Sequence, residues 1–364
     1  MLRSPTFYAY IVRQFLFWFL AVLLVLTSVI AVFEFVEFVR QVSSVPELPL
    51  SLAFALAGFK LPSDIEILFH FAVLIAAMVT FWRMTRSREL VVARAAGLSA
   101  WQFLAPVILA AMVLGVIKIT VVNPVSAAMY SRFERLNLDV LGGTGDVMKV
   151  ARTGFWLRQK DDSGIVVIHA EKVSGNGDNL QSAMFLLLNP DESYRGRIDA
   201  ANAQLRDGRW EISDAWVMRG QEPPEHVDST SIPSNLTRNG IQERFASQQT
   251  ISFWDLPDYI RNLDSTGFSS VRYRIAYQSL LSQPLLMAAM ILVAAAFSLR
   301  PGRRVDTVLM IVGAIVTGFS IFVLGDIVAA LGRAGTLPVP MAAWATSGVA
   351  LMFGVAALLH LEDG

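Results

Sequence analysis

Charged side chains near the ends of long apolar segments are the residues of this sequence best placed to do chemistry. Glu34, Glu37 and Arg40 recur every third residue, so a helix places them within about 120° of arc on one face. Ionisable groups at a membrane boundary usually face a cavity or a partner rather than lipid. The other interpretation is a local Glu37–Arg40 pair, which stabilises a helix by about 0.2–0.5 kcal/mol. The sequence leaves both open.

Two further arginines, Arg132 and Arg135, lie one helical turn apart just beyond another apolar segment. Guanidinium groups at this spacing suit an anionic headgroup, because each can donate to a phosphate or carboxylate in bidentate fashion. A solvated helical face explains the pair alone more simply.

Residues 86–99, RSRELVVARAAGLS, have apolar positions at helical spacing between polar ends. Ser87 can cap the start of a helix and Gly97 can cap its end. We therefore predict a short helix lying along the membrane. It either serves only as a basic topogenic loop, or docks on a cytoplasmic ATPase with Glu89 pairing to a basic residue of that partner.

The elements that position these residues are membrane-spanning helices. The chain of 364 residues is 54% hydrophobic and only 16% charged, where a soluble protein has about a quarter charged residues. A span needs about 20 mostly apolar residues. Six segments qualify, namely residues 14–33, 65–82, 103–122, 275–299, 305–324 and 341–359. Lys118, near one end of the third, is expected to extend its side chain to the interface.

The arginines predict the orientation of these helices, because short cytoplasmic loops carry an excess of Lys and Arg. They gather at the N-terminus and after the second and fourth segments, at Arg3, Arg13, Arg83, Arg86, Arg88, Arg94, Arg300, Arg303 and Arg304. The opposite loops carry Glu34, Glu37, Arg40, Glu47, Lys60 and Arg333. Both termini are then cytoplasmic, and the long polar region between the third and fourth segments lies outside the cytoplasm.

That polar region reads as a β domain. Residues 155–158 and 165–168 flank a turn at 161–164, and residues 203–206 and 210–212 flank Asp207-Gly208, so both pairs predict hairpins. Residues 184–188 form a further apolar strand, residues 229–239 suggest a loop, and residues 253–263 suggest a helix capped by Ser252. Short strands with frequent turns indicate a sandwich, barrel or jelly roll.

The sequence also excludes several kinds of site. It contains no Gly-Lys pair and hence no P-loop, no HExxH or GxSxG motif, and no cysteine. The four histidines, His70, His169, His226 and His360, lie in different settings, which disfavours a metal site. With no net charge, the chain lacks the basic excess of a nucleic-acid-binding protein. We expect no cofactor and no catalytic residue.

The whole arrangement resembles the lipopolysaccharide-export permeases of Gram-negative inner membranes, the LptF/LptG family. The likeness rests on six helices with a β domain between the third and fourth, on Pro62-Ser63-Asp64, and on the acidic-Leu-Val pattern that starts at Glu89 and ends in Gly97-Leu98-Ser99. Glu34-Phe35-Val36-Glu37 and the Pro-x-Asp sequence fit the LptG kind of subunit better than the LptF kind. The resemblance implies three parts of the chain. Residues 1–131 would form helices one to three with a coupling helix at about 86–99, residues 132–270 a periplasmic jelly-roll-like domain, and residues 271–364 helices four to six.

The resemblance further implies a subunit that extracts lipopolysaccharide from the inner membrane and passes it to a periplasmic bridge. Its partners would be a paralogous LptF-like permease, an LptB-like ATPase dimer, an LptC-like bridge protein with one membrane anchor, and lipopolysaccharide itself. The coupling helix would use Glu89, Arg88, Arg94 and Gly97, and the substrate path would include Glu34, Glu37, Arg40, Arg132 and Arg135. Glu34 departs from the family, whose members carry a basic residue there.

Two other classes of function fit the residues without the resemblance. One is a membrane-anchored scaffold whose β domain binds partners without transport. The other is a proton-coupled carrier that titrates Glu34, Glu37, His70 and Asp326, although these lie near helix ends and such relays usually lie at the midplane.

Overall fold

The structure is a computed structural model that describes most of the chain. The described residues are 5–43, 49–95, 97, 99–141, 155–161, 164–174, 179–191, 193–206, 208–220, 222–234, 247–265, 269–299 and 307–363. They divide into two compact units, a helical one (Met1–Glu134, Gln248–Ile260 and Ser270–Gly364) and a second one (Arg135–Ser247 and Arg261–Ser269). Leu98 and Arg300, Arg303 and Arg304 of the basic loops lie outside the described residues.

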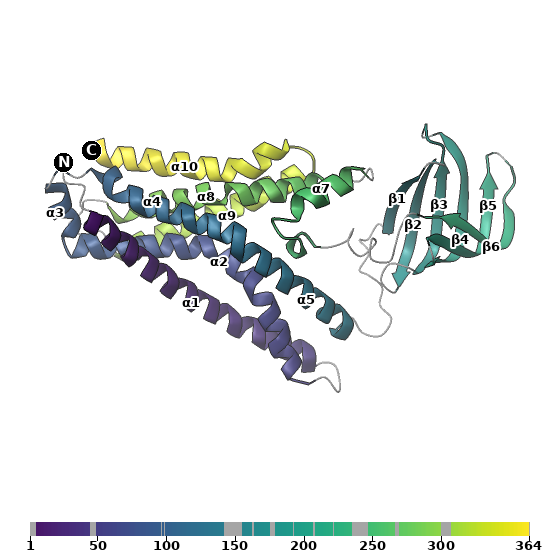
Figure 1. The fold of residues 1–364 in the computed structure, drawn as a ribbon, viewed down its shortest axis with the longest axis horizontal. Helices are drawn as coiled ribbons and strands as arrows, with labels where there is room; N and C mark the ends of the chain where they lie inside the picture. Colours follow the sequence, from purple (N-terminus) through teal and green to yellow (C-terminus); the bar gives the residue numbers. More distant parts are fainter. Residues whose placement is uncertain are drawn as a thin grey trace. The chain divides into compact units, whose positions relative to one another are not determined.

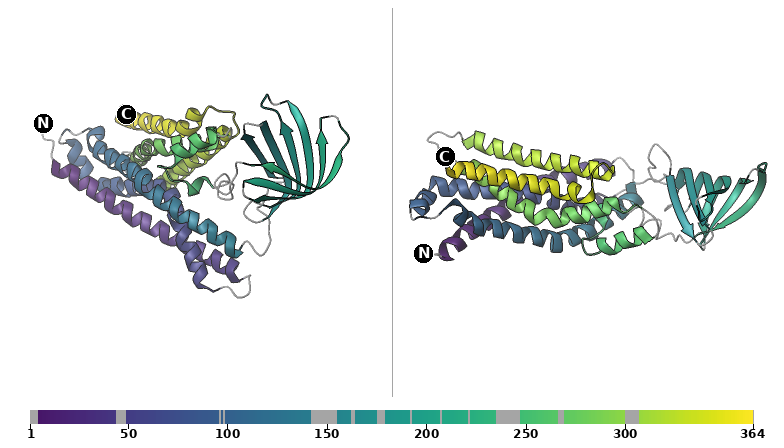
Figure 2. Two further views of the ribbon diagram at one scale, coloured as in Figure 1. Left: turned by 45° about the vertical axis from the view of Figure 1, so that its right-hand side comes forward. Right: turned by 90° about the horizontal axis from the view of Figure 1, so that it is seen from above.

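Among the described residues, six helices are long and apolar enough to cross a membrane, which confirms the predicted number (Figure 1). They are α1 (Pro5–Ser43), α2 (Ser51–Arg86), α4 (Ala100–Ile117) continuing through the π-helical turn η1 (Lys118–Val122) into α5 (Asn123–Leu141), α8 (Val271–Ser298), α9 (Thr307–Arg333) and α10 (Val339–Asp363). The start of α1, the short helix α3 (Glu89–Ala95) and the end of α10 lie at the same end of the bundle (Figures 1 and 2).

The helices run further than their apolar segments predict. Glu34, Glu37 and Arg40 lie within α1 and Lys60 lies within α2, so none of them is in a loop. The expected position of the two arginines was also wrong, because Arg132 lies in α5, which continues the third span. A hydropathy window finds only the part of a helix that lipid must solvate, whereas backbone hydrogen bonding continues through polar turns with good helix propensity.

Small residues allow the helices to pack closely. Helix α8 is buried almost continuously from Leu286 to Ala296. Gly115 of α4 faces Pro284 of α8, and a Cβ placed on Gly115 would lie 2.7 Å from the Pro284 Cα. Close backbone approach at small residues is the usual way to pack helices in lipid, where the hydrophobic effect adds little between them.

The second unit contains a six-stranded antiparallel sheet, which confirms the predicted inserted all-β domain. Its strands are β1 (Phe155–Asp161), β2 (Gly164–Ser174), β3 (Asn179–Leu188), β4 (Tyr194–Arg206), β5 (Arg209–Arg219) and β6 (Glu225–Pro233). Each described strand pairs with its neighbour in sequence, so the sheet is a meander, and both predicted hairpins form, β1–β2 and β4–β5.

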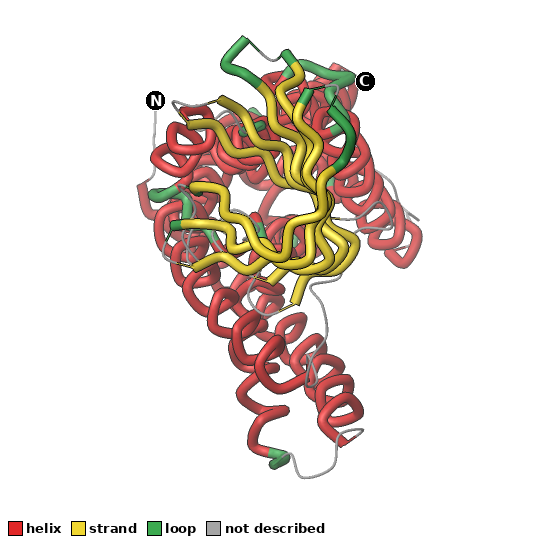
Figure 3. Tube along the Cα trace, turned by 90° about the vertical axis from the view of Figure 1, so that its right-hand side faces the viewer, coloured by secondary structure: helices red, strands yellow, loops and turns green. Residues whose placement is uncertain are grey.

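A line of irregularities bends this sheet. Strands β3 to β6 each expose two consecutive side chains at the same level, at residues 181–182, 201–202, 213–214 and 228–229. Ser182 and Asp214 adopt positive φ values of 50° and 53° there. Because the pairing stays one to one across this line, the four strands change their alternation together, and the same face points inward on both sides of the bend. The sheet is therefore curved (Figure 3), with one face that buries Phe185, Trp210 and their apolar neighbours.

The predicted loop at residues 229–239 was wrong in its first part. Residues Ser229 to Pro233 belong to β6 and pair with β5, because cross-strand hydrogen bonds override the weak strand propensity of serine. Residues 235–239 lie outside the described part of the chain. The predicted helix at 253–263 corresponds to α7 (Leu256–Ser265), and the Ser252 hydroxyl lies close to Asp255 just before it.

Candidate functional site

Helix α3 forms the turn between α2 and α4 and exposes one of its faces. Among the α3 side chains that the structure describes, Ala93 is buried at 6% exposed, whereas Val92 is 68% exposed. Seven residues cannot form a stable helix alone, so contacts with α2 hold it. The predicted short helix after α2 is thus present, and it leaves Val92 exposed.

The backbone that enters and leaves α3 is constrained. Arg88 has a positive φ of 62° and donates its N–H to the Thr85 carbonyl, as a residue ending α2 in the left-handed conformation does. Ser87 therefore caps the end of α2, and its hydroxyl donates to Glu89 Oε1 at 2.8 Å. Gly97 follows α3 with φ of 83°. The backbone of Arg94 lies within α3.

A second group of charges lies on the parts of α1 and α2 far from α3. Arg40 donates to Glu37 at 2.9 Å, and Gln41 donates to the same carboxylate at 2.8 Å. The local pair left open by the sequence is thus present. Glu34 forms an ion pair with Lys60 of α2, at 2.5 Å. That partner was missed because it lies 26 residues away.

The arginines of α5 flank a residue that contacts α1. Both Arg132 and Arg135 expose their side chains. Phe133, between them, is buried and packs against Phe38 of α1 at 5.6 Å between ring centroids. The buried phenylalanine fixes which face of α5 covers α1 and leaves the two arginines on the outside.

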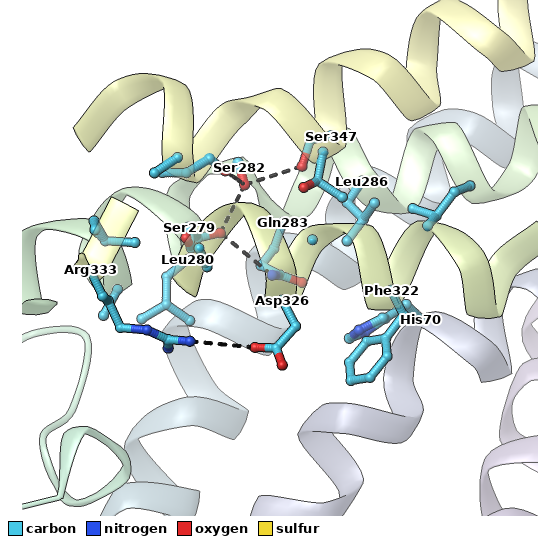
Figure 4. Close-up of a pocket in the computed structure, with 18 of the residues that line it drawn as sticks. His70, Ser279, Leu280, Ser282, Gln283, Leu286, Phe322, Asp326, Arg333 and Ser347 are labelled. Carbon is cyan, nitrogen blue, oxygen red and sulfur yellow. Dashed lines mark hydrogen bonds and ion pairs between the residues drawn. The ribbon is translucent and has the colours of Figure 1, made fainter. Parts of the chain in front are cut away.

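A pocket of about 290 Å³ opens between α2, α8, α9 and α10 (Figure 4). Asp326 and Arg333 of α9 form an ion pair of 3.7 Å at one side of it. His70 lies on the other side with Phe322, and its Nδ1 has no hydrogen-bond partner among the described residues. Ser347 donates to Ser282 across the pocket wall at 3.2 Å (Figure 4). Apolar side chains line much of the remaining wall, including Ile275, Leu280, Leu286, Met290 and Ile321, together with polar residues such as Ser279, Gln283 and Thr346.

Lys118, in the third span, does not lie where the sequence predicts. Lys118 does not reach an interface: it is 3% exposed, and its Nζ donates to Gln283 Oε1 of α8 at 2.9 Å. The side chain turns inward because its position lies in η1, where the helix faces α2 and α8. Nearby, Asn123 Nδ2 donates to the two carboxylate oxygens of Glu66 at 3.2 and 3.4 Å.

These arrangements suit binding and movement. Among the described residues, no group of three His, Asp or Glu side chains could hold a metal ion. The pocket is about twice the size of a cavity that holds benzene, so it can take part of one acyl chain.

Comparison with known proteins decides which molecule is moved. Residues 9–360 match the family described as "Lipopolysaccharide export system permease LptF/LptG". The chain belongs to this family. It is 25% identical over 274 residues, 74% of each chain, to the lipopolysaccharide export system permease protein LptG of Escherichia coli K12. It is 23% identical over 326 residues, 87% of this chain and 88% of the relative, to LptG of Haemophilus influenzae.

The family match confirms the predicted permease, and the named relatives agree with its predicted likeness to the LptG kind. As an LptF/LptG permease the chain is a non-catalytic membrane subunit of lipopolysaccharide export. Sequence reasoning missed Lys60, Gln283 and Asn123, each of which pairs with a charged side chain on another helix. Polar residues inside an otherwise apolar helix were the available signal.

Proposed function

We propose that this permease is the LptG-like half of a heterodimer that an ATPase drives. The other half would be a paralogous LptF-like permease, and the pair would bind a cytoplasmic LptB-like ATPase dimer and an LptC-like bridge protein. The family name covers both kinds of permease, and the relatives compared above are LptG proteins. The complex would extract lipopolysaccharide from the inner membrane and pass it to the bridge.

The orientation follows from the end of the bundle at which α3 lies. The start of α1, the end of α10 and α3 share that end (Figure 1), and Arg83, Arg86 and Arg88 directly precede α3 in the chain. Clustered arginines in short loops favour the cytoplasmic side. The β domain is inserted after α5, which leads away from that end, so we place it in the periplasm.

The observation that carries the proposal is the geometry of α3. A permease without a nucleotide site needs a mechanical contact with its ATPase. Helix α3 supplies an exposed Val92 and a carboxylate, Glu89, positioned by Ser87. The left-handed Arg88 and Gly97 fix where the helix begins and ends. Arg88 and Arg94 would add cationic contacts with the ATPase.

The substrate path would start at the outer ends of α1, α2 and α5. Arg40, Arg132 and Arg135 all have exposed side chains and would meet phosphate groups of the lipid. Glu37 would hold Arg40 in place. Glu34 would not repel the anionic lipid because Lys60 neutralises it.

The need for ATP follows from the chemistry of the lipid. Moving acyl chains into water costs about 0.8 kcal/mol per CH₂, so several chains cost far more than thermal energy supplies. The pocket between α2, α8, α9 and α10 would shield part of one chain. The apolar face of the curved sheet, with Phe185 and Trp210, would then shield chains in the periplasm.

The test is co-purification of the permease, wild type and Glu89→Arg, from detergent-solubilised membranes. Recovery of a P-loop ATPase and a second six-helix permease with the wild type is expected. The variant should lose the ATPase, because reversing the charge places two cations against each other. Glu222→Arg makes the same change in the exposed turn between β5 and β6 and should retain both partners.

Other outcomes favour the scaffold. If the wild type brings down neither partner and Glu89→Arg changes nothing, ATP-driven transport is wrong for this chain. A scaffold that binds partners only through its β domain would then explain the result.

A further inference from the structure

The π-helical turn η1 joins three parts of the permease that are distant in sequence. In this turn the Asn123 N–H donates to the carbonyl of Lys118, five residues back, instead of the usual four. Single π-helical turns in α-helices occur often at functional sites. This one lies within a membrane span and contains a buried lysine.

The first two connections are to helices α2 and α8. Asn123 donates to the carboxylate of Glu66 on α2, and Lys118 donates to Gln283 on α8. Helix α2 continues unbroken from Glu66 to Arg86, where the chain turns into α3. A displacement of α3 therefore reaches Glu66 through one continuous helix.

The third connection is to residues 252–255, which precede α7 and follow the β domain in the chain. The Phe253 N–H donates to Asn123 Oδ1 at 2.8 Å. The Trp254 indole N–H donates at 3.3 Å to the carbonyl of Thr120, inside the π-helical turn. Phe253 also stacks on Tyr277 of α8, with 5.4 Å between ring centroids and an angle of 13°.

Asn123 thus occupies the centre of the arrangement, because its amide donates to α2 and its carbonyl accepts from residue 253 at the same time. Replacing either partner would leave a polar group of this half-buried side chain unsatisfied. Such buried networks fix one geometry when every member is satisfied.

From these contacts we propose that η1 transmits the movement of α2 to the chain segment that returns from the β domain, with Asn123 as the positioning residue. The proposal rests on the proposed coupling role of α3, since α3 is where the movement would begin. ATP-driven displacement of α2 would move Glu66, and Asn123 would pass that displacement to Phe253 and Trp254. Extraction of the lipid would then be accompanied by a displacement of residues 252–255.

The test measures lipopolysaccharide released per ATP hydrolysed by the complete transporter in proteoliposomes, with purified acceptor protein outside. Asn123→Ala removes both bonds of the positioning residue. Trp254→Phe removes only the indole donor of an exposed side chain, so it leaves the fold intact. Trp344→Phe is the matched control, because its exposed indole donates to Gln278 of α8 at 3.1 Å, away from η1.

We expect Asn123→Ala to lower the release per ATP by roughly fivefold or more, the low end of typical couplings between sites. Trp254→Phe should lower it less and Trp344→Phe not at all. A purely structural role would lower the amount of folded transporter, and with it release and hydrolysis in equal proportion, leaving the ratio unchanged. An unchanged ratio in both Asn123→Ala and Trp254→Phe overturns the proposal.

The design separates failure of this proposal from failure of the proposed function. If wild-type complex releases lipid with ATP and Glu89→Arg loses the ATPase, an unchanged ratio in the η1 variants refutes transmission through η1 alone. If the wild type shows no ATP-dependent release, the coupling role of α3 is wrong, and transmission from it is wrong as well.

Discussion

The close approach of α4 to α8 makes Gly115 a residue whose replacement should destabilise the helical unit. A methyl group at this position would lie 2.7 Å from the Pro284 Cα and 3.0 Å from its nitrogen. Both are backbone atoms, so no side chain can rotate away, and α4 must shift from α8. Forced overpacking of this kind costs about 1–3 kcal/mol. The better helix propensity of alanine returns about 1 kcal/mol at most.

Gly58→Ala is the matched control, because Gly58 is also inside a long helix and an added Cβ meets no atom within 4 Å. It should be neutral or stabilise the protein by up to about 1 kcal/mol. The assay is unfolding in detergent, by heat or by increasing SDS, followed by far-UV circular dichroism. Gly115→Ala should unfold earlier than wild type and Gly58→Ala at the same point or later. Equal behaviour of the two variants would show that α4 and α8 do not meet as closely as the structure has them.

Three further outcomes follow from local geometry. Gly97→Ala should destabilise the end of α3 by about 1–2 kcal/mol, because the φ of 83° suits glycine. Hydrogen exchange of the α3 amides should then become about 5- to 30-fold faster. Unchanged exchange would contradict the fixed end of α3. Trp210→Phe should lower the free energy of unfolding by less than about 2 kcal/mol, since it removes a buried indole N–H that has no partner among the described residues. Phe185→Ala should lower it by about 3–5 kcal/mol, as measured by chemical denaturation. Similar losses in the two variants would argue against the unsatisfied indole donor. Hydrogen bonds from Ser193 hold the pKa of the Asp191 carboxyl below its usual value, so Ser193→Ala should raise that pKa in an NMR titration. The stabilisation that this lowered pKa supplies is present above the carboxyl's ordinary pKa and is lost as pH falls through the lowered value; an unshifted titration in the variant would show that the hydroxyl does not act on Asp191.

Much of the fold could be predicted from the sequence, because the spans and the hairpins each depend on a local pattern of residues. Apolar length fixed the number of spans, and alternation with Gly-containing turns located two hairpins. The bounds of the helices were less accessible, since polar residues continue α1 and α2 beyond the part that lipid must cover. The meander order of the described strands and the bend across them depend on pairing between strands, which hydropathy does not encode.

Only part of the candidate site could be predicted from the sequence, because only part of it depends on a local pattern. The short helix after α2 is a local feature, and the sequence predicted it together with its terminal Gly97. Its start was less clear, because Ser87 fits the start of one helix as well as the end of the other. In the structure it ends α2 and still reaches Glu89, so one hydroxyl serves both helices.

The meaning of a charge in this permease is set by a partner that the sequence does not reveal. Glu34 alone suggests a negative charge that would repel an anionic headgroup, but the pair that it forms with Lys60 has no net charge. Lys118 alone suggests an interfacial side chain, but Gln283 receives it inside the bundle. An isolated buried ion would cost several kcal/mol, so each pair also restricts which helices can lie together. The polar residues of α1, α2, η1 and α8 therefore select the packing of the spans, and the exposed arginines of α1 and α5 are left to meet the lipid.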